Sequence, residues 1–225
     1  MTYEGFRLRI SKIWRKKLAN FRRKKLEGSD FTIISNNCWG GMIYESYNLL
    51  KESPTIGLFF FAADYIHFLK NLRESFAAQL RFISPEESKW KEIPELAGDK
   101  RFGCYPIGQL FIKGKTVEIF FLHYHSESEA KAKWERRCKR VNWKHMLVKF
   151  NDQNGTTQKD LDEFLQLPYN KLFFTCKKWE NMDQNCYVIN QPYCYSSITT
   201  SREPFGNNRY VNITEKINFL YKNAN

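Results

Sequence analysis

The stretch that decides the fold is FTIISNNCWGG, residues 31–41. Residues 31–35 are mostly aromatic or β-branched and contain no proline, which predicts a buried strand. A polar turn follows at residues 36–39, and two glycines then lead into MIYESYNLL, which has helical spacing. Strand, polar turn, glycines and helix in this order predict the opening βα unit of an open α/β sheet. In such sheets, ligands bind beyond the carboxyl ends of the strands.

The turn itself supports two interpretations. In the first, Asn36, Asn37, Cys38 and Trp39 line a ligand site, and the backbone N–H groups at Gly40-Gly41 approach a phosphate. In the second, the asparagines form a tight turn and the tryptophan is part of the core. Neither the GxGxxG nor the GxxxxGK[ST] pattern is present, so the sequence does not predict a dinucleotide site or a P-loop.

Further along the chain, strand-like and helix-like segments alternate. Strands are expected at 55–61, 116–124, 145–150, 171–176 and 187–190, and helices at 42–50, 63–80, 126–141, 156–167 and 213–221. This order predicts an α/β fold, Rossmann-like, with a mostly parallel, mixed sheet and helices on both faces. Residues 108–112 and 116–124 are expected to form an antiparallel hairpin.

Composition places the chain among ordinary soluble globular proteins. It has 225 residues, of which 42% are apolar and 27% charged. The longest apolar run, at 56–63, is far shorter than a membrane span, and we expect no signal peptide because the basic N-terminus lacks an apolar segment. The six cysteines show no metal-ligand spacing and are expected to be reduced thiols in a cytoplasmic protein.

The positive charge is concentrated at the N-terminus. Residues 1–25 carry ten Lys/Arg and one acid, a net charge of +9 out of the total of +12. We therefore expect residues 1–28 to form a basic arm and residues 29–225 to form a single α/β domain. The near-neutral remainder argues against a nucleic-acid-binding surface.

The arm is predicted to be an amphipathic helix. Its large apolar residues recur at steps of three and four, opposite a basic face: Phe6, Ile10, Ile13, Trp14, Leu18 and Phe21. Such a helix suits an anionic membrane surface, with residues 6–25 in contact with the bilayer. The alternative is a helix packed on its own domain or on a second subunit.

If the strands are parallel, their trailing polar residues meet at one edge of the sheet. Besides the 36–39 turn, that edge is expected to contain Asp64, His123, His125, Ser126, Asn151 and Asp152. Ser126 and Glu129 form a capping box that starts a helix. A second basic stripe on that helix contains Lys133, Arg136, Arg137 and Arg140. Arg136–Arg140 should lie at the opposite edge of the sheet, because the helix runs away from the site and ends there.

For two of these candidates the sequence supports both a chemical role and a structural one. Cys38 precedes a helix and has histidines as expected neighbours, the setting of an activated thiolate, but scattered cysteines are usually small buried hydrophobic residues. Asp152 and Asn154 offer oxygen ligands for a divalent ion, but Asp-x-Asn-Gly is also an ordinary turn, which we favour. No metal site is therefore predicted, and the sequence leaves the cofactor open.

Several motifs together resemble a bacterial family of unknown function whose members are commonly labelled exopolysaccharide or capsule biosynthesis proteins. The motifs are SNNCWGG (35–41), SPTIGLFFFAADYIHFLKNL (53–72), CYPIG (104–108) and HYHSESEAKAKWERRCKRVNW (123–143). The resemblance implies a place in surface-polysaccharide assembly, in the cytoplasm or at the inner face of the membrane. It brings no established reaction and no known catalytic residues.

Two functional hypotheses follow. In the first, the protein is a transferase for an activated or lipid-linked sugar: Asn36, Asn37, Cys38 and Trp39 hold the substrate, His123 or His125 acts as base, and Asp64 orients it. In the second, it is a non-catalytic scaffold that docks polysaccharide-synthesis enzymes. A nucleic-acid binder is the least favoured reading.

Overall fold

The computed structural model describes residues 3–191 and 195–222. Its centre is a four-stranded, fully parallel sheet with the order β1-β5-β6-β7. The strands are β1 (Thr32–Ser35), β5 (Met146–Asn151), β6 (Asn170–Thr175) and β7 (Cys186–Val188). The strand predicted from residues 31–35 is therefore confirmed, and so is the mostly parallel sheet.

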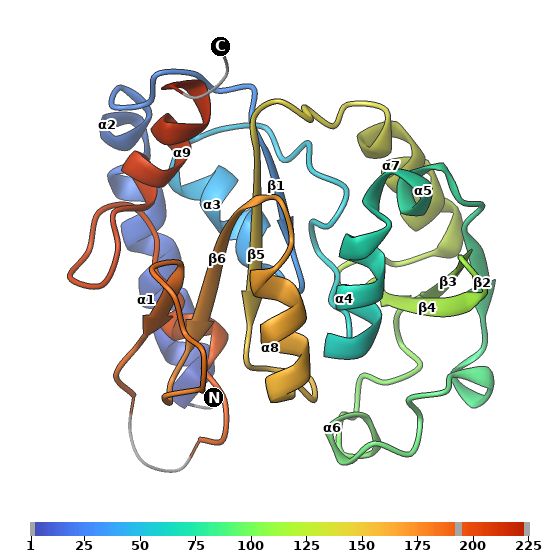
Figure 1. Cartoon of the computed structure of the whole chain (residues 1–225). Coiled ribbons are helices and arrows are strands. Elements are labelled where there is room, and N and C mark those ends of the chain that lie inside the picture. The colour runs from blue at the N-terminus through green and yellow to red at the C-terminus, as the bar shows by residue number, and fades with distance from the viewer. Residues whose placement is uncertain (1–2, 192–194, 223–225) are drawn as a thin grey trace.

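Helices cover both faces of this sheet (Figure 1). On one side lie α1 (Tyr3–Lys17), α2 (Ala19–Arg23), α3 (Trp39–Ser46) and α9 (Ile213–Lys222). On the other lie α4 (Ala62–Lys70), α5 (Leu72–Ala77), α7 (Glu127–Cys138) and α8 (Gln158–Leu165). Successive strand residues alternate between the two cores: Ile33 and Leu147 face α3 and α9, whereas Ile34 and Val148 face α4 and α8. The expectation of an α/β fold with helices on both faces is confirmed.

A second, antiparallel sheet follows α5. It has the order β2-β3-β4, with β2 (Arg81–Ile83), β3 (Ile107–Ile112) and β4 (Lys115–Phe120). The predicted hairpin is confirmed, and its two-residue turn has both Lys113 and Gly114 at positive φ, as a type I′ turn requires. Three short helical pieces complete the described chain: η1 (Pro85–Glu87), α6 (Pro94–Ala97) and η2 (Thr200–Arg202).

The hairpin corrects one expectation about the site. Because β4 belongs to the antiparallel sheet, His123 and His125 do not follow a strand of the parallel sheet. The sequence pattern of residues 116–124 identifies a strand but does not say which sheet the strand joins.

The predicted strand at 55–61 is also wrong. This segment has no regular structure, and its single bridge joins Phe59 to Phe120 of β4. Its backbone connects the two sheets: the N–H of Phe60 donates to the carbonyl of Asn36, and Phe59 exchanges hydrogen bonds with Phe120. Leu58 and Phe60 are fully buried. The apolar run thus reflects burial between two sheets, which has the same hydrophobic signature as a central strand.

Most helix boundaries differ from the prediction by only a few residues. The helix predicted at 63–80 divides into α4 and α5 at Asn71, whose carbonyl accepts from the Ser75 hydroxyl. Ser126 caps α7 by accepting from the N–H of Glu129, and Asn212 accepts from the N–H of Glu215 at the start of α9.

Candidate functional site

Polar side chains from the carboxyl ends of the parallel strands meet in one cluster, which contains part of the predicted set: Asn36, Asn37, Asn151 and Asp152. Asn36 follows β1 and donates its amide N–H to Oδ1 of Asn151, the last residue of β5, at 2.7 Å. Asn37 donates to Oε1 of Gln153 at 2.9 Å, and Asn151 donates to the same oxygen at 2.9 Å. The two strand ends are therefore joined through a shared amide network.

At the centre of this cluster lies a buried ion pair between Lys149 and Glu203. Lys149 is in β5, and its Nζ contacts Oε1 of Glu203 while donating to Oδ1 of Asn37 at 3.0 Å. Both charged side chains have zero exposure. Burial lowers the pKa of Lys149, and the Glu203 carboxylate beside it opposes that shift. Trp39 also lies near the ammonium group, which is 6.0 Å from the indole ring centre.

Asp152 extends the cluster to β6. Its Oδ2 accepts from the Thr175 hydroxyl at 2.6 Å and from the backbone N–H of Cys176 at 3.2 Å. Its Oδ1 accepts from the backbone N–H of Ile198 at 2.7 Å, which fixes a segment near the end of the chain over the sheet edge. Asp152 thus ties β5, β6 and the covering segment together.

The cluster is closed to solvent. Residues 198–204 cover it, held by the bonds to Glu203 and Ile198 and by the indole N–H of Trp39, which donates to the Pro204 carbonyl at 2.8 Å. Its members are all less than a tenth exposed: Asn36, Asn37, Lys149, Asn151, Asp152, Thr175 and Glu203. None of these side chains has a buried polar atom without a hydrogen-bond partner. The network is a satisfied buried structure, and a ligand would reach it only if residues 198–204 moved.

Trp39, Gly40 and Gly41, expected to line the site, serve packing instead. Trp39 is fully buried against Phe174. A Cβ on Gly40 would lie 3.0 Å from the Ser35 hydroxyl, so glycine lets α3 pack closely on β1. The N–H of Gly40 donates to Ser35, and that of Trp39 donates to Asn37. The N–H of Gly40, one of the two expected to approach a phosphate, is therefore already hydrogen-bonded.

Cys38 lies at the outer margin of this cluster and is half-buried. Burial raises the pKa of its thiol to about 12, and the Glu203 carboxylate adds to the rise. The thiol therefore carries its proton at neutral pH. A nucleophilic cysteine needs the opposite shift, so this environment weighs against the thiolate hypothesis.

His123 is exposed, and the charges of Arg101 and Lys51 affect it as they affect Cys38. Partial desolvation, followed by the charges of Arg101 and Lys51, lowers the pKa of His123. The charges of Arg101 and Lys51 also oppose the rise in the pKa of the Cys38 thiol, but by less than burial raises it. A neutral, exposed imidazole is able to accept a proton, whereas Arg101 is already paired with Asp99 at 2.9 Å.

The other predicted catalytic residues have structural roles away from the cluster. Asp64 accepts from Lys89 at 2.5 Å and from the Trp90 indole at 2.8 Å, and its Oδ2 accepts from the N–H of Glu118 in β4. None of its hydrogen bonds goes to a histidine, so the expectation that Asp64 orients the base is not met. Ser126 is the N-cap of α7, and His125 beside it is exposed, its backbone N–H bonded to Glu129.

The Asp152–Asn154 segment is a turn, the reading favoured from the sequence. Asn154 and Gly155 both have positive φ, and the Asn154 side chain donates to the carbonyl of Phe60. Within residues 3–191 and 195–222, no group of three or more His, Cys, Asp or Glu side chains is placed to hold a metal ion.

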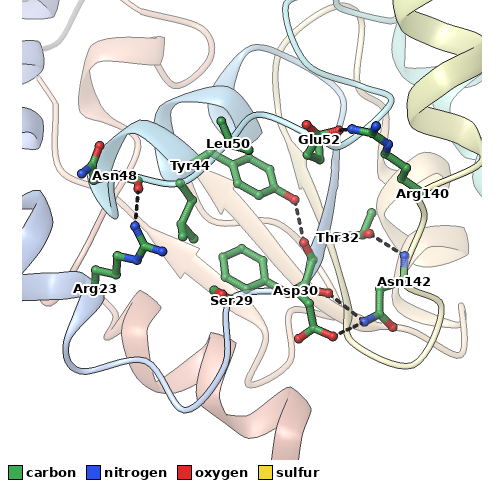
Figure 2. Close-up of a pocket in the computed structure, with 12 residues that line it drawn as sticks. Arg23, Ser29, Asp30, Thr32, Tyr44, Asn48, Leu50, Glu52, Arg140 and Asn142 are labelled. Carbon is green, nitrogen blue, oxygen red and sulfur yellow. Dashed lines mark hydrogen bonds and ion pairs between the residues drawn. The ribbon is translucent and has the colours of Figure 1, made fainter.

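An open pocket of about 680 Å³ lies at the opposite, amino edge of the sheet (Figure 2). Arg140 pairs with Glu52 at 2.6 Å on one side of it, and Asn142 donates to Asp30 at 3.0 Å on another. Arg23 at the end of α2 donates to the carbonyl of Asn48. Arg140 thus lies at the amino edge, as predicted for the second basic stripe, and it shares this pocket with the arm.

Sequence reasoning missed the two residues at the centre of the cluster. Lys149 lies in the apolar run HMLVKF. A single charged residue in a buried strand can be recognised from the sequence, because such a residue must be paired. Glu203 lies 52 residues beyond Asn151 in an irregular segment and offers no comparable signal. Lys51 and Arg101 are likewise exposed loop residues whose relation to Cys38 depends on tertiary structure.

Comparison with known proteins identifies a family without a function. The sequence profile described as "Domain of unknown function (DUF1919)" matches residues 9–221. A protein from Haemophilus influenzae described as "Uncharacterized protein" is 31% identical over 167 residues, which is 74% of this chain and 71% of that protein. These matches confirm the expectation of an uncharacterised bacterial family at the level of the family alone.

Proposed function

Because this chain belongs to the family described as a domain of unknown function, DUF1919, we propose its function from its own site: it is a transferase of exopolysaccharide or capsule biosynthesis that acts on an activated or lipid-linked sugar. The proposal takes its biological setting from the motif resemblance and its chemistry from the carboxyl edge of the sheet. Cytoplasmic location at the inner face of the membrane is part of the same proposal.

The observation that carries the proposal is the meeting of strand-end amides and carboxylates at that edge. Asn36, Asn151 and Asp152 come from two neighbouring strands and lie where parallel α/β sheets bind their ligands. Amide and carboxylate groups pair well with sugar hydroxyls, because each hydroxyl is both a donor and an acceptor. In the closed structure the amide of Asn151 donates to Glu203 and Gln153, and Asp152 accepts from Thr175 and the N–H of Ile198; these partners occupy the positions that hydroxyls would take.

The reaction is assigned to the accessible margin of the cluster. His123 takes the proton from an acceptor hydroxyl, whose oxygen forms a bond to the anomeric carbon of the sugar. The bond from that carbon to the phosphate oxygen breaks, and the released phosphate keeps the electron pair. Lys51 offsets its negative charge, together with Arg101, which in this structure is paired with Asp99 at 2.9 Å. Cys38, protonated at neutral pH, serves as a weak hydrogen-bond donor at the same margin.

The test measures turnover of a panel of nucleoside diphosphate sugars by purified wild-type, His123→Gln and His125→Gln proteins. General-base catalysis is worth roughly 10²–10⁴-fold, so His123→Gln should lower turnover by about that factor. His125→Gln is the comparison variant, since His125 is also exposed and its backbone N–H is bonded to Glu129 of α7. Wild-type activity should fall on acidification only below pH 6.5, because the pKa of His123 is lowered from that value. Equal loss in both variants, or none in His123→Gln, would contradict the assignment.

A second candidate, a non-catalytic scaffold, is favoured by the sealed state of the cluster. A network with no unpaired polar atom and no open cleft is what a structural role requires. In cells lacking the gene, His123→Gln should fail to restore polymer if the protein is a transferase. Full restoration by this variant would favour the scaffold.

A further inference from the structure

The N-terminal arm packs on its domain through polar groups, not through its apolar stripe. Arg15 is buried and pairs with Glu45 of α3 at 3.2 Å. Arg22 donates to the carbonyls of Arg15 and Ser46, and Glu4 accepts from the hydroxyl of Ser201 in η2 at 2.7 Å. The inward residues recur at helical spacing, so one polar face holds the arm in place.

The large apolar residues of the arm consequently point outward. We call this set the arm stripe: Tyr3, Phe6, Ile10, Ile13, Trp14, Leu18 and Phe21. It contains seven of the twelve large apolar side chains that are exposed in the described part of the chain, and Ile13 and Phe21 are 64% and 59% exposed. Such a concentration on one helix marks an interaction surface, whereas single exposed apolar residues need no explanation.

Exposed cations flank the arm stripe. Seven of the ten Lys/Arg in residues 7–25 are exposed: Arg9, Lys12, Lys16, Lys17, Arg23, Lys24 and Lys25. The ammonium groups of Lys17 and Lys25 lie 5.7 Å and 4.4 Å from the ring centres of Trp14 and Phe21. Glu4, the acidic residue of α1, is bonded to Ser201 and lies away from the arm stripe.

We propose that the arm stripe and its flanking cations bind the surface of an anionic lipid bilayer, with α1 and α2 lying in the interface. Charge complementarity selects this occupant, because a second copy of the same face would bring cations against cations. Aromatic and aliphatic side chains beside lysines are typical of interfacial helices, and about 21 residues at 1.5 Å each give a contact roughly 30 Å long. No helix among the described residues is long and apolar enough to cross the bilayer. The inference does not depend on the transferase proposal, since it rests on other residues.

The test is co-sedimentation of the full-length protein with phosphatidylcholine vesicles that contain or lack phosphatidylglycerol. Wild-type protein should bind the anionic vesicles, and added salt should weaken binding because the cations act through screened charge. The double variant Ile13→Ser/Phe21→Ser should lower partitioning by at least about tenfold. Phe111→Ser is the matched control: Phe111 is 72% exposed on β3 in the other sheet and should leave binding unchanged.

Several outcomes would overturn the proposal. They are no binding to anionic vesicles, equal binding to neutral ones, or equal loss in the arm and Phe111 variants. A concentration-dependent dimer that the double variant abolishes, without vesicle binding, would assign the stripe to a second copy instead. Because the substituted side chains are exposed, circular dichroism should show that the variants remain folded. A failed transferase assay would leave the vesicle result unaffected.

Discussion

At the carboxyl edge of the parallel sheet, Lys149 and Glu203 lie fully buried in a closed amide network, whereas at the amino edge Arg140 and Glu52 pair beside an open pocket. The Arg140 and Glu52 side chains are 53% and 34% exposed. Both edges therefore contain an ion pair and asparagines, but water reaches only one of them. The difference shows that the edge where α/β sheets bind ligands can have the required side chains and still be sealed.

The largest expected difference concerns removal of one charge from each pair. Lys149→Met leaves the Glu203 carboxylate buried and uncompensated, which should cost about 3–5 kcal/mol in the free energy of unfolding. Arg140→Met removes an exposed pair and should cost about 1 kcal/mol or less. Urea denaturation of both variants measures the contrast.

The double variant Lys149→Met/Glu203→Leu provides the control. Because it removes both buried charges, it should recover part of the stability that Lys149→Met loses; the amides of Asn37 and Asn151, which lose Glu203 as an acceptor, keep the recovery incomplete. Equal destabilisation by Arg140→Met and Lys149→Met would mean that water reaches both edges alike. The conclusion that the carboxyl edge is sealed from water would then be wrong.

A smaller contrast is expected between the asparagines of the two edges. Asn151→Ala leaves the buried amide of Asn36 without its acceptor, so a loss of about 1–3 kcal/mol is expected. Asn142 at the amino edge is half-buried and bonds to Asp30 and to the N–H of Lys144. Water replaces these partners in Asn142→Ala, which should cost about 0.5–1.5 kcal/mol. Thermal unfolding of the two variants decides the order, and a larger loss in Asn142→Ala would contradict it.

The same contrast explains what the sequence could predict. Local patterns identified β1, the hairpin, the Ser126 cap and the meeting of Asn36 with Asn151, because each depends on neighbouring residues or on strand direction. The partner of Lys149 could not be found, since Glu203 comes from an irregular segment more than fifty residues away. The strand predicted at 55–61 failed because burial between two sheets and burial within one give the same apolar run.

The arm shows a related limit. Its helical periodicity was readable, but the sequence did not show which face packs inward. Arg15 is buried and Arg22 half-buried there because Glu45 and the Ser46 carbonyl are in place to accept from them.

The smallest expected effect is a pH-dependent one at the amino edge. Tyr221 donates its hydroxyl to Oδ1 of Asp30 at 2.7 Å, and this hydrogen bond is the main cause of the lowered pKa of Asp30. A carboxyl group whose pKa is lowered on folding adds stability above its unfolded pKa, near 3.8, and that stability is lost as the pH falls through the lowered folded value. Tyr221→Phe removes the bond, so the stability gap between wild type and variant should be present at pH 6 and shrink below pH 3.8.

The size of the stability difference between wild type and Tyr221→Phe also tests whether the amino edge is open to water. Because the Asp30 side chain is 69% exposed, water screens the interaction, and the pH-dependent part should be less than about 1 kcal/mol. Urea titrations of both proteins at pH 6, 4 and 2.5 measure this difference in the free energy of unfolding. A gap that stays constant over this range would mean that the Tyr221 hydroxyl stabilises the fold without acting through the Asp30 charge. A gap of several kcal/mol would mean that Asp30 is as sealed from water as Lys149, and the contrast between open and closed edges would fail.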